Sequence, residues 1–71
     1  MEIKVGKAGR ILAGKEQGRY VKVIDDEANT GGYLILTAAG SDMQNGFDCW
    51  VESADMLQRF FEESGWVVEW P

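Results

Sequence analysis

Residues 53–65 carry the complete pattern of one amphipathic helix, and this pattern limits the chain's architecture more than any other feature. Ser53 is suited to cap the start, because its hydroxyl can accept a hydrogen bond from a first-turn N–H. Gly65 is suited to end the helix in a left-handed conformation. The sequence therefore predicts one helix over about 54–64. Its apolar stripe consists of Met56, Leu57, Phe60 and Phe61.

The rest of the chain has the pattern of short strands separated by turns rich in glycine. The run 33–37 is apolar and rich in residues that favour strands, so we expect a central strand there. The loops expected at 26–32 and 38–46 are polar, and the second closes with the turn dipeptide Asn45-Gly46. The predicted strands cover residues 2–5, 10–13, 19–25, 33–37, 47–52 and 66–70.

These elements predict an α+β fold in the order β-β-β-β-β-α-β. We expect a mostly antiparallel sheet of five to six short strands, with the helix on one face. One helix covers only part of such a sheet, so some of the opposite face or an edge must be exposed or paired with another chain. We therefore expect a homo-oligomer, a dimer or larger.

Length, charge and cysteine usage restrict the class of protein. The 71 residues make one domain, 1–71, and 45% of them are hydrophobic, too many for a disordered segment. The single cysteine cannot form an internal disulfide, and no segment resembles a signal peptide or a membrane span, which together indicate a cytoplasmic protein. Six of the seven basic residues lie within residues 1–22, whereas the remainder is strongly acidic. This asymmetry suits a basic partner or head-to-tail contacts between copies, unless the charges pair across the sheet or face water.

Several chemistries are excluded by the residues that are absent. The chain has no histidine, which removes the commonest general base and the commonest metal ligand. We therefore predict no catalytic residues, no cofactor and no metal site, and no enzymatic activity. The basic segment carries only Tyr20 as an aromatic residue, so we also predict no nucleic-acid binding.

An acidic run, Asp25-Asp26-Glu27, lies at the expected 26–32 loop. Its spacing does not fit a calcium-binding EF-hand loop, since Thr30 and Leu36 stand where that loop needs glycine and glutamate. Two interpretations remain: an ordinary solvated loop, or a weak cation site. These three acids are also candidates for contact with a basic partner.

The alternating strand 47–52 offers the most suggestive surface. If Phe47, Cys49 and Val51 face the core, Trp50 faces outward between Asp48 and Glu52. An outward tryptophan flanked by acids is suited to anchor a basic partner. The other interpretation is that Trp50 packs under a loop or in a dimer seam. On the same alternation Cys49 is a small buried hydrophobe.

Trp66 and Trp70 alternate with Val67 and Glu69 along the last expected strand. This spacing places both tryptophans on the face that the helix covers. We therefore expect them to be part of the core.

The second half of the chain resembles small uncharacterised bacterial proteins. The similarity is carried by Gly32 to Leu36, Gly46 to Glu52 and Glu62 to Trp70. Some proteins of this type are carried on mobile elements such as integron cassettes, and some are similar to immunity proteins that neutralise a toxin. The resemblance implies a bacterial origin and a binding role, and it assigns no site residues.

Two functional hypotheses follow from these observations. The first is a protein-binding module, immunity-like, that presents an acidic aromatic surface to a basic protein. The second is a homo-oligomeric domain that binds a small apolar or cationic ligand at a subunit boundary. Neither hypothesis involves a membrane or a nucleic acid.

Overall fold

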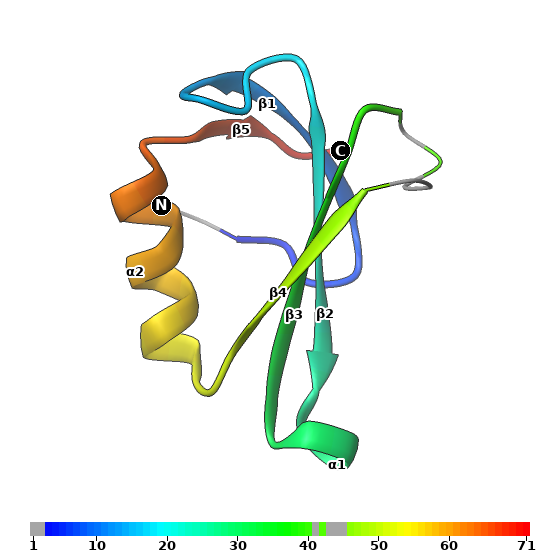
Figure 1. Cartoon of the computed structure of the whole chain (residues 1–71), viewed down its shortest axis with the longest axis vertical. Helices are drawn as coiled ribbons and strands as arrows, with labels where there is room; N and C mark the ends of the chain where they lie inside the picture. Colours follow the sequence, from blue (N-terminus) through cyan, green and yellow to red (C-terminus); the bar gives the residue numbers. More distant parts are fainter. Residues whose placement is uncertain (1–2, 41, 43–45) are drawn as a thin grey trace.

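A computed structural model describes residues 3–40, 42 and 46–71 of the chain. It contains one antiparallel five-stranded sheet in the order β4-β3-β2-β1-β5, with an eleven-residue helix, α2, along one face (Figure 1). The predicted α+β class is therefore confirmed. In chain order the elements are β1 (Ala8–Ala13), β2 (Tyr20–Asp26), α1 (Glu27–Thr30), β3 (Gly32–Ala38), β4 (Phe47–Val51), α2 (Ala54–Ser64) and β5 (Val67–Glu69).

Helix α2 begins and ends where its sequence predicts. The Ser53 hydroxyl accepts a hydrogen bond of 3.2 Å from the Met56 amide, and Gly65 closes the helix at φ 68°. The expected apolar stripe is only partly buried: Leu57 and Phe61 lie in the core, Phe60 is half-buried and Met56 is exposed. The helix therefore contacts the sheet along a narrower line than the stripe predicts.

Two local expectations are wrong. Residues 3–5 do not join the sheet, because the position beside β1 that an additional strand would fill is taken by β5. The expected 26–32 loop is mostly regular secondary structure. Asp26 completes β2, Glu27–Thr30 form one helical turn, and Gly31 ends that turn at φ 81°. The Asn45 position of the predicted turn dipeptide lies outside the described residues.

Aromatic side chains fill the core between α2 and the sheet. The Phe61 ring is fully buried and meets the Trp66 ring edge-on, with centroids 5.2 Å apart. The Trp70 ring stacks on Phe61, with centroids 6.2 Å apart. Both tryptophans thus occupy the helix-facing side, as predicted. The buried cluster is Ile11, Val21, Val23, Ile35, Val51, Leu57, Phe61 and Trp66.

Candidate functional site

In the part of the chain that the structure describes, no helix lies over the face of the sheet opposite α2, and the side chains of this face form three rows across the strands. One row is apolar and ends at Trp50, whereas the other two mix charged and apolar residues. Because directly opposed residues of antiparallel strands point to the same face, the strand register fixes the members of each row. The rows are Glu69–Arg10–Tyr20–Ala38, Ala8–Lys22–Leu36–Asp48 and Ile24–Leu34–Trp50.

Trp50 lies at the β4 end of the apolar row and is 47% exposed. Its orientation away from α2 agrees with the sequence prediction, but its indole is also tied to the protein. The indole Nε1 donates a hydrogen bond of 2.8 Å to the Thr30 hydroxyl, which in turn donates to the Asp26 carbonyl at 3.2 Å. One edge of the side chain is therefore held against the protein, and the rest is exposed.

Gly32 makes this position of the indole possible. A Cβ atom at residue 32 would lie 2.7 Å from Trp50 Nε1 and would also collide with the Val51 carbonyl oxygen. Since only glycine lacks that atom, the first residue of β3 allows both the ring and the neighbouring strand to approach closely. No local sequence pattern predicts this contact, because it joins residues far apart in the chain.

Two carboxylates accompany the indole. Asp48 lies on the same helix-free face as Trp50, directly across from Leu36, and is exposed. Glu52 is exposed just beyond the last residue of β4. The structure therefore brings Asp48 and Trp50 together on one face and places Glu52 beside the end of the strand.

The predicted acidic run forms the corner where β2 passes into α1. Asp26 lies on the helix-free side of β2, the side of Trp50, whereas Asp25 lies directly across from Tyr33 on the helix-facing side. The Asp25 carboxylate accepts a hydrogen bond from the Glu27 amide at 3.0 Å, and Asp26 accepts one from the Asn29 side chain at 3.1 Å. Thr30 joins this corner to Trp50. Within the described residues no group of three or more acidic or cysteine side chains is arranged to hold a metal ion, so the corner receives no support as a cation site.

Glu27 also accepts a hydrogen bond of 3.0 Å from the Tyr33 hydroxyl. This bond, together with burial and the charges of Glu27 and Asp25, raises the pKa of Tyr33 above the ordinary value of about 10. The raised pKa means that the folded chain keeps a proton that the unfolded chain releases. The stabilisation of the fold by the protonated Tyr33 hydroxyl is therefore complete below the pKa that Tyr33 has in the unfolded chain. It is lost as the pH rises through the pKa of Tyr33 in the folded chain.

Replacing Tyr33 with phenylalanine should remove this part of the pH dependence. The difference in unfolding free energy between the wild type and Tyr33→Phe is expected to be constant below pH about 9 and to shrink above about 10. Urea titrations followed by circular dichroism at several alkaline pH values measure this difference. Tyr20→Phe, which removes a hydroxyl from the helix-free face, is the control, and an identical alkaline profile for both variants would contradict the assignment.

The helix-facing side of β4 differs from its prediction. Phe47, Cys49 and Val51 do share that side, but only Val51 is buried, while Phe47 is 76% exposed and Cys49 is exposed. The expectation of a buried Cys49 is wrong because α2 packs over the Val51 end of β4 and leaves the remainder uncovered. The result is a hollow of about 190 Å³, lined by Glu16, Ile35, Thr37, Phe47, Cys49, Phe60 and Trp66.

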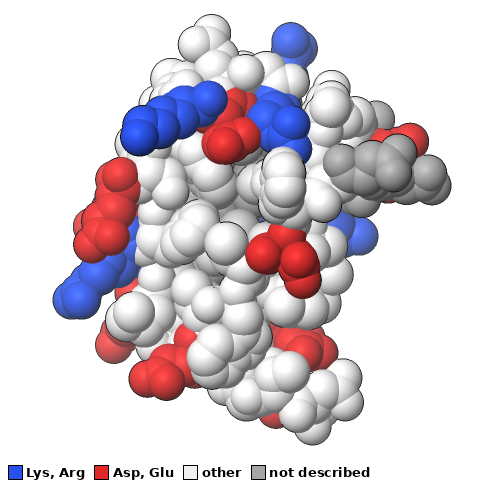
Figure 2. All heavy atoms as spheres, in the orientation of Figure 1, with Lys and Arg blue, Asp and Glu red and all other residues white. Residues whose placement is uncertain are grey.

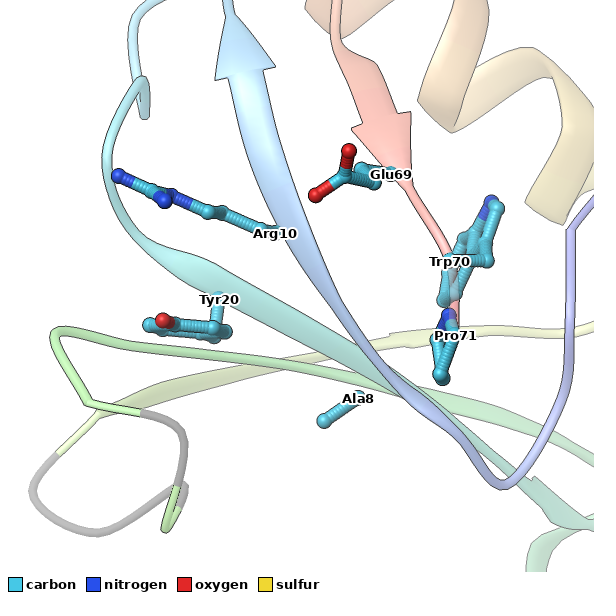
Figure 3. A pocket seen from close by; sticks show the side chains of 6 residues that line it. All are labelled: Ala8, Arg10, Tyr20, Glu69, Trp70 and Pro71. Carbon is cyan, nitrogen blue, oxygen red and sulfur yellow. The ribbon is translucent and has the colours of Figure 1, made fainter.

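A second, wider hollow of about 540 Å³ lies beside β1 and β5 (Figure 3). Arg10 and Tyr20 extend side by side on one side of it, Trp70 and Pro71 lie on the other, and Glu69 is between them. Aromatic walls with a carboxylate suit a cationic guest, but the Arg10 charge opposes one. This hollow is therefore a weaker ligand site than its size indicates.

The charges follow the division seen in the sequence. Acidic side chains lie over β4, along α2 and around α1, whereas basic ones gather mainly at the end that holds the β1–β2 connection (Figure 2). No helix in the described part of the chain is long and apolar enough to cross a membrane. Comparisons with protein-family models, with curated proteins and with solved structures found no match, so the resemblance of the second half to small bacterial proteins stays a prediction.

Proposed function

We propose that this chain is a non-enzymatic protein-binding module that presents an acidic aromatic surface to a basic partner. The acidic aromatic surface is defined as Asp48 and Trp50 of β4, Glu52 just after β4, and the corner formed by Asp25, Asp26 and Glu27. The observation that carries the proposal is the half-exposed Trp50 indole, held by Thr30 beside an exposed carboxylate.

The fixed position of the indole favours binding. Ordering a mobile side chain on association costs free energy, and the hydrogen bond from Trp50 to Thr30 reduces that cost before a partner arrives. The open part of the ring offers apolar area and a π face for a lysine or arginine. The neighbouring carboxylates attract the same side chains and raise the rate of encounter. Tryptophan, moreover, is enriched among residues that dominate interface energies.

A charge-reversal experiment tests the proposal. The double variant Asp48→Lys/Glu52→Lys is expected to weaken binding of a basic partner by about 100-fold, since two attractive contacts become repulsive. The immobilised chain is exposed to a bacterial lysate, and the dissociation constant is then measured with the purified partner. Glu62→Lys/Glu63→Lys, which makes the same charge change on the exposed side of α2, is the matched control.

The outcomes separate specific binding from general charge attraction. A partner that is kept by the control and lost by the β4 variant supports the proposal. A partner that binds both variants equally well, or that is lost equally from both, contradicts it. Thermal unfolding of each variant shows whether the substitutions leave the fold intact.

The second candidate is a homo-oligomer that binds a small ligand at a subunit boundary. It is favoured by the half-buried aliphatic side chains Ile24, Leu34 and Leu36 on the helix-free face, which a second copy could cover. Molar mass measured by light scattering across a wide concentration range distinguishes the two. A stable dimer would favour this candidate, and a persistent monomer would favour partner binding. In either case we place the protein in the cytoplasm, where the exposed Cys49 stays reduced.

A further inference from the structure

Strand β4 is an open edge of the sheet. It has β3 on one side and, among residues 3–40, 42 and 46–71, no strand on the other, and its first four residues are all exposed. Edge strands present unpaired backbone N–H and C=O groups, and proteins usually protect them with lysine, proline, a bulge or a very short strand. The sequence Phe-Asp-Cys-Trp-Val contains neither lysine nor proline. By contrast, the other edge, β5, has only three residues.

Both faces of β4 offer side-chain contacts to a strand laid beside it. On the helix-facing side, Phe47 and Cys49 open onto the 190 Å³ hollow, whose far wall includes Phe60 and Trp66. On the helix-free side lie Asp48 and Trp50. Side chains alternate between the two faces of a strand. The side chains on one face of an added strand would therefore meet the mostly apolar hollow, and those on the other face would meet Asp48 and Trp50.

From these features we infer that β4 binds an extended, basic segment of a partner protein as an additional strand of the sheet. The inference rests on the protein-binding function proposed above and adds its mode and the chemistry of the segment. The residue opposite Cys49 is apolar and enters the hollow. The residues on either side of it, opposite Asp48 and Trp50, are lysine or arginine. Backbone hydrogen bonds supply affinity, and the alternating side chains supply specificity.

Charge favours such a segment over a second copy of this chain. None of residues 23–58 is lysine or arginine, so the charged residues in this stretch of the chain are all acidic. Arg19 does lie over the Phe47 ring, 5.9 Å from its centroid, but its charge is paired with Glu16. If two copies of β4 paired antiparallel around Cys49, the two Asp48 side chains would lie diagonally on one face and repel each other. Pairing β4 with β5 would instead bring Glu69 toward Asp48 or Glu52. A basic segment meets no such repulsion.

Peptides with methylated backbone nitrogens test this mode directly. The probe is the capped peptide Thr-Arg-Leu-Arg-Thr, titrated into isotope-labelled protein and followed by amide chemical shifts. In an added strand the N–H groups of alternate residues point toward β4, so methylation at the leucine and methylation at the two arginines should differ. One of the two methylated peptides is expected to lose about tenfold or more in affinity, while the other binds like the parent.

A matched pair of protein variants identifies the edge. Asp48→Asn is expected to weaken the parent peptide by about threefold to tenfold, whereas Glu63→Gln, which removes the same charge from α2, leaves it unchanged. The shifted amides should be those of β4 and of the residues that line the hollow. Shifts that spare β4 would overturn the inference.

The remaining outcomes separate this inference from the proposed function. If the parent and both methylated peptides bind alike, side chains alone carry the contact, and strand addition is wrong while a basic partner still stands. If the parent peptide fails to bind but the purified partner binds, the assigned segment chemistry is wrong. Protection of β4 amides from hydrogen exchange that grows with protein concentration, in the absence of peptide, would show that a second copy fills the edge and would also overturn the inference.

Discussion

Replacing Phe61 with alanine is expected to lower the free energy of unfolding by about 3–5 kcal/mol. The ring is fully buried, and its centroid lies 5.2 Å from that of the Trp66 ring and 6.2 Å from that of the Trp70 ring. Truncation therefore leaves a cavity bounded by rigid aromatic rings, which cannot easily move in to fill it. A chain of this length has a total stability of about 4–10 kcal/mol. The substitution therefore removes a large share of it. Urea denaturation followed by circular dichroism measures the change.

Phe60 provides the matched control for this prediction. It is the same residue type, next to Phe61 on α2, but it is only half-buried and borders the hollow beside Cys49. Phe60→Ala is therefore expected to cost clearly less than Phe61→Ala. Equal losses would contradict the difference in burial between the two rings. A loss of less than about 1 kcal/mol for Phe61→Ala would contradict the assigned core.

The helix could be predicted from sequence because its signals are local. Ser53 and Gly65 act on residues within one turn, and the structure shows the hydroxyl of Ser53 bonded to the Met56 amide. Strands β2 and β3 were predicted to within one residue at each end for a similar reason: turn residues mark their limits, and their apolar content fits a half-buried sheet. The α+β class follows from these elements together.

The parts that sequence could not provide are those that depend on distant segments. The pairing of β5 with β1 joins the two ends of the chain, and no local pattern predicts it. The burial of Cys49 was predicted from alternation, but alternation gives only the side of the sheet. Whether that side is covered depends on how far α2 reaches along β4. The same is true of the surface around Trp50: the sequence gives its outward direction, but not its hydrogen bond to Thr30 twenty residues away.

Gly32→Ala is expected to destabilise the protein by about 3 kcal/mol, near the upper end of the usual range for overpacking. A methyl group at this position meets both the Val51 carbonyl and the Trp50 indole, the latter at 2.7 Å. The carbonyl belongs to the backbone of β4, which cannot move without disturbing its pairing with β3. Urea denaturation of Gly32→Ala measures the loss, and a loss within about 0.5 kcal/mol of zero would contradict the close approach of the strands.

A double-mutant cycle with Trp50→Ala separates the two collisions. Removing the indole leaves only the collision with the Val51 carbonyl, so Gly32→Ala should cost less in the Trp50→Ala background than in the wild type. The difference measures how firmly the indole is pressed against β3. If Gly32→Ala destabilises both backgrounds equally, the indole swings aside freely. Binding a partner would then cost free energy to order a mobile Trp50 side chain. A large difference would instead mean that the anchor offered to a partner is already fixed by the fold, through the same glycine that lets β3 and β4 approach.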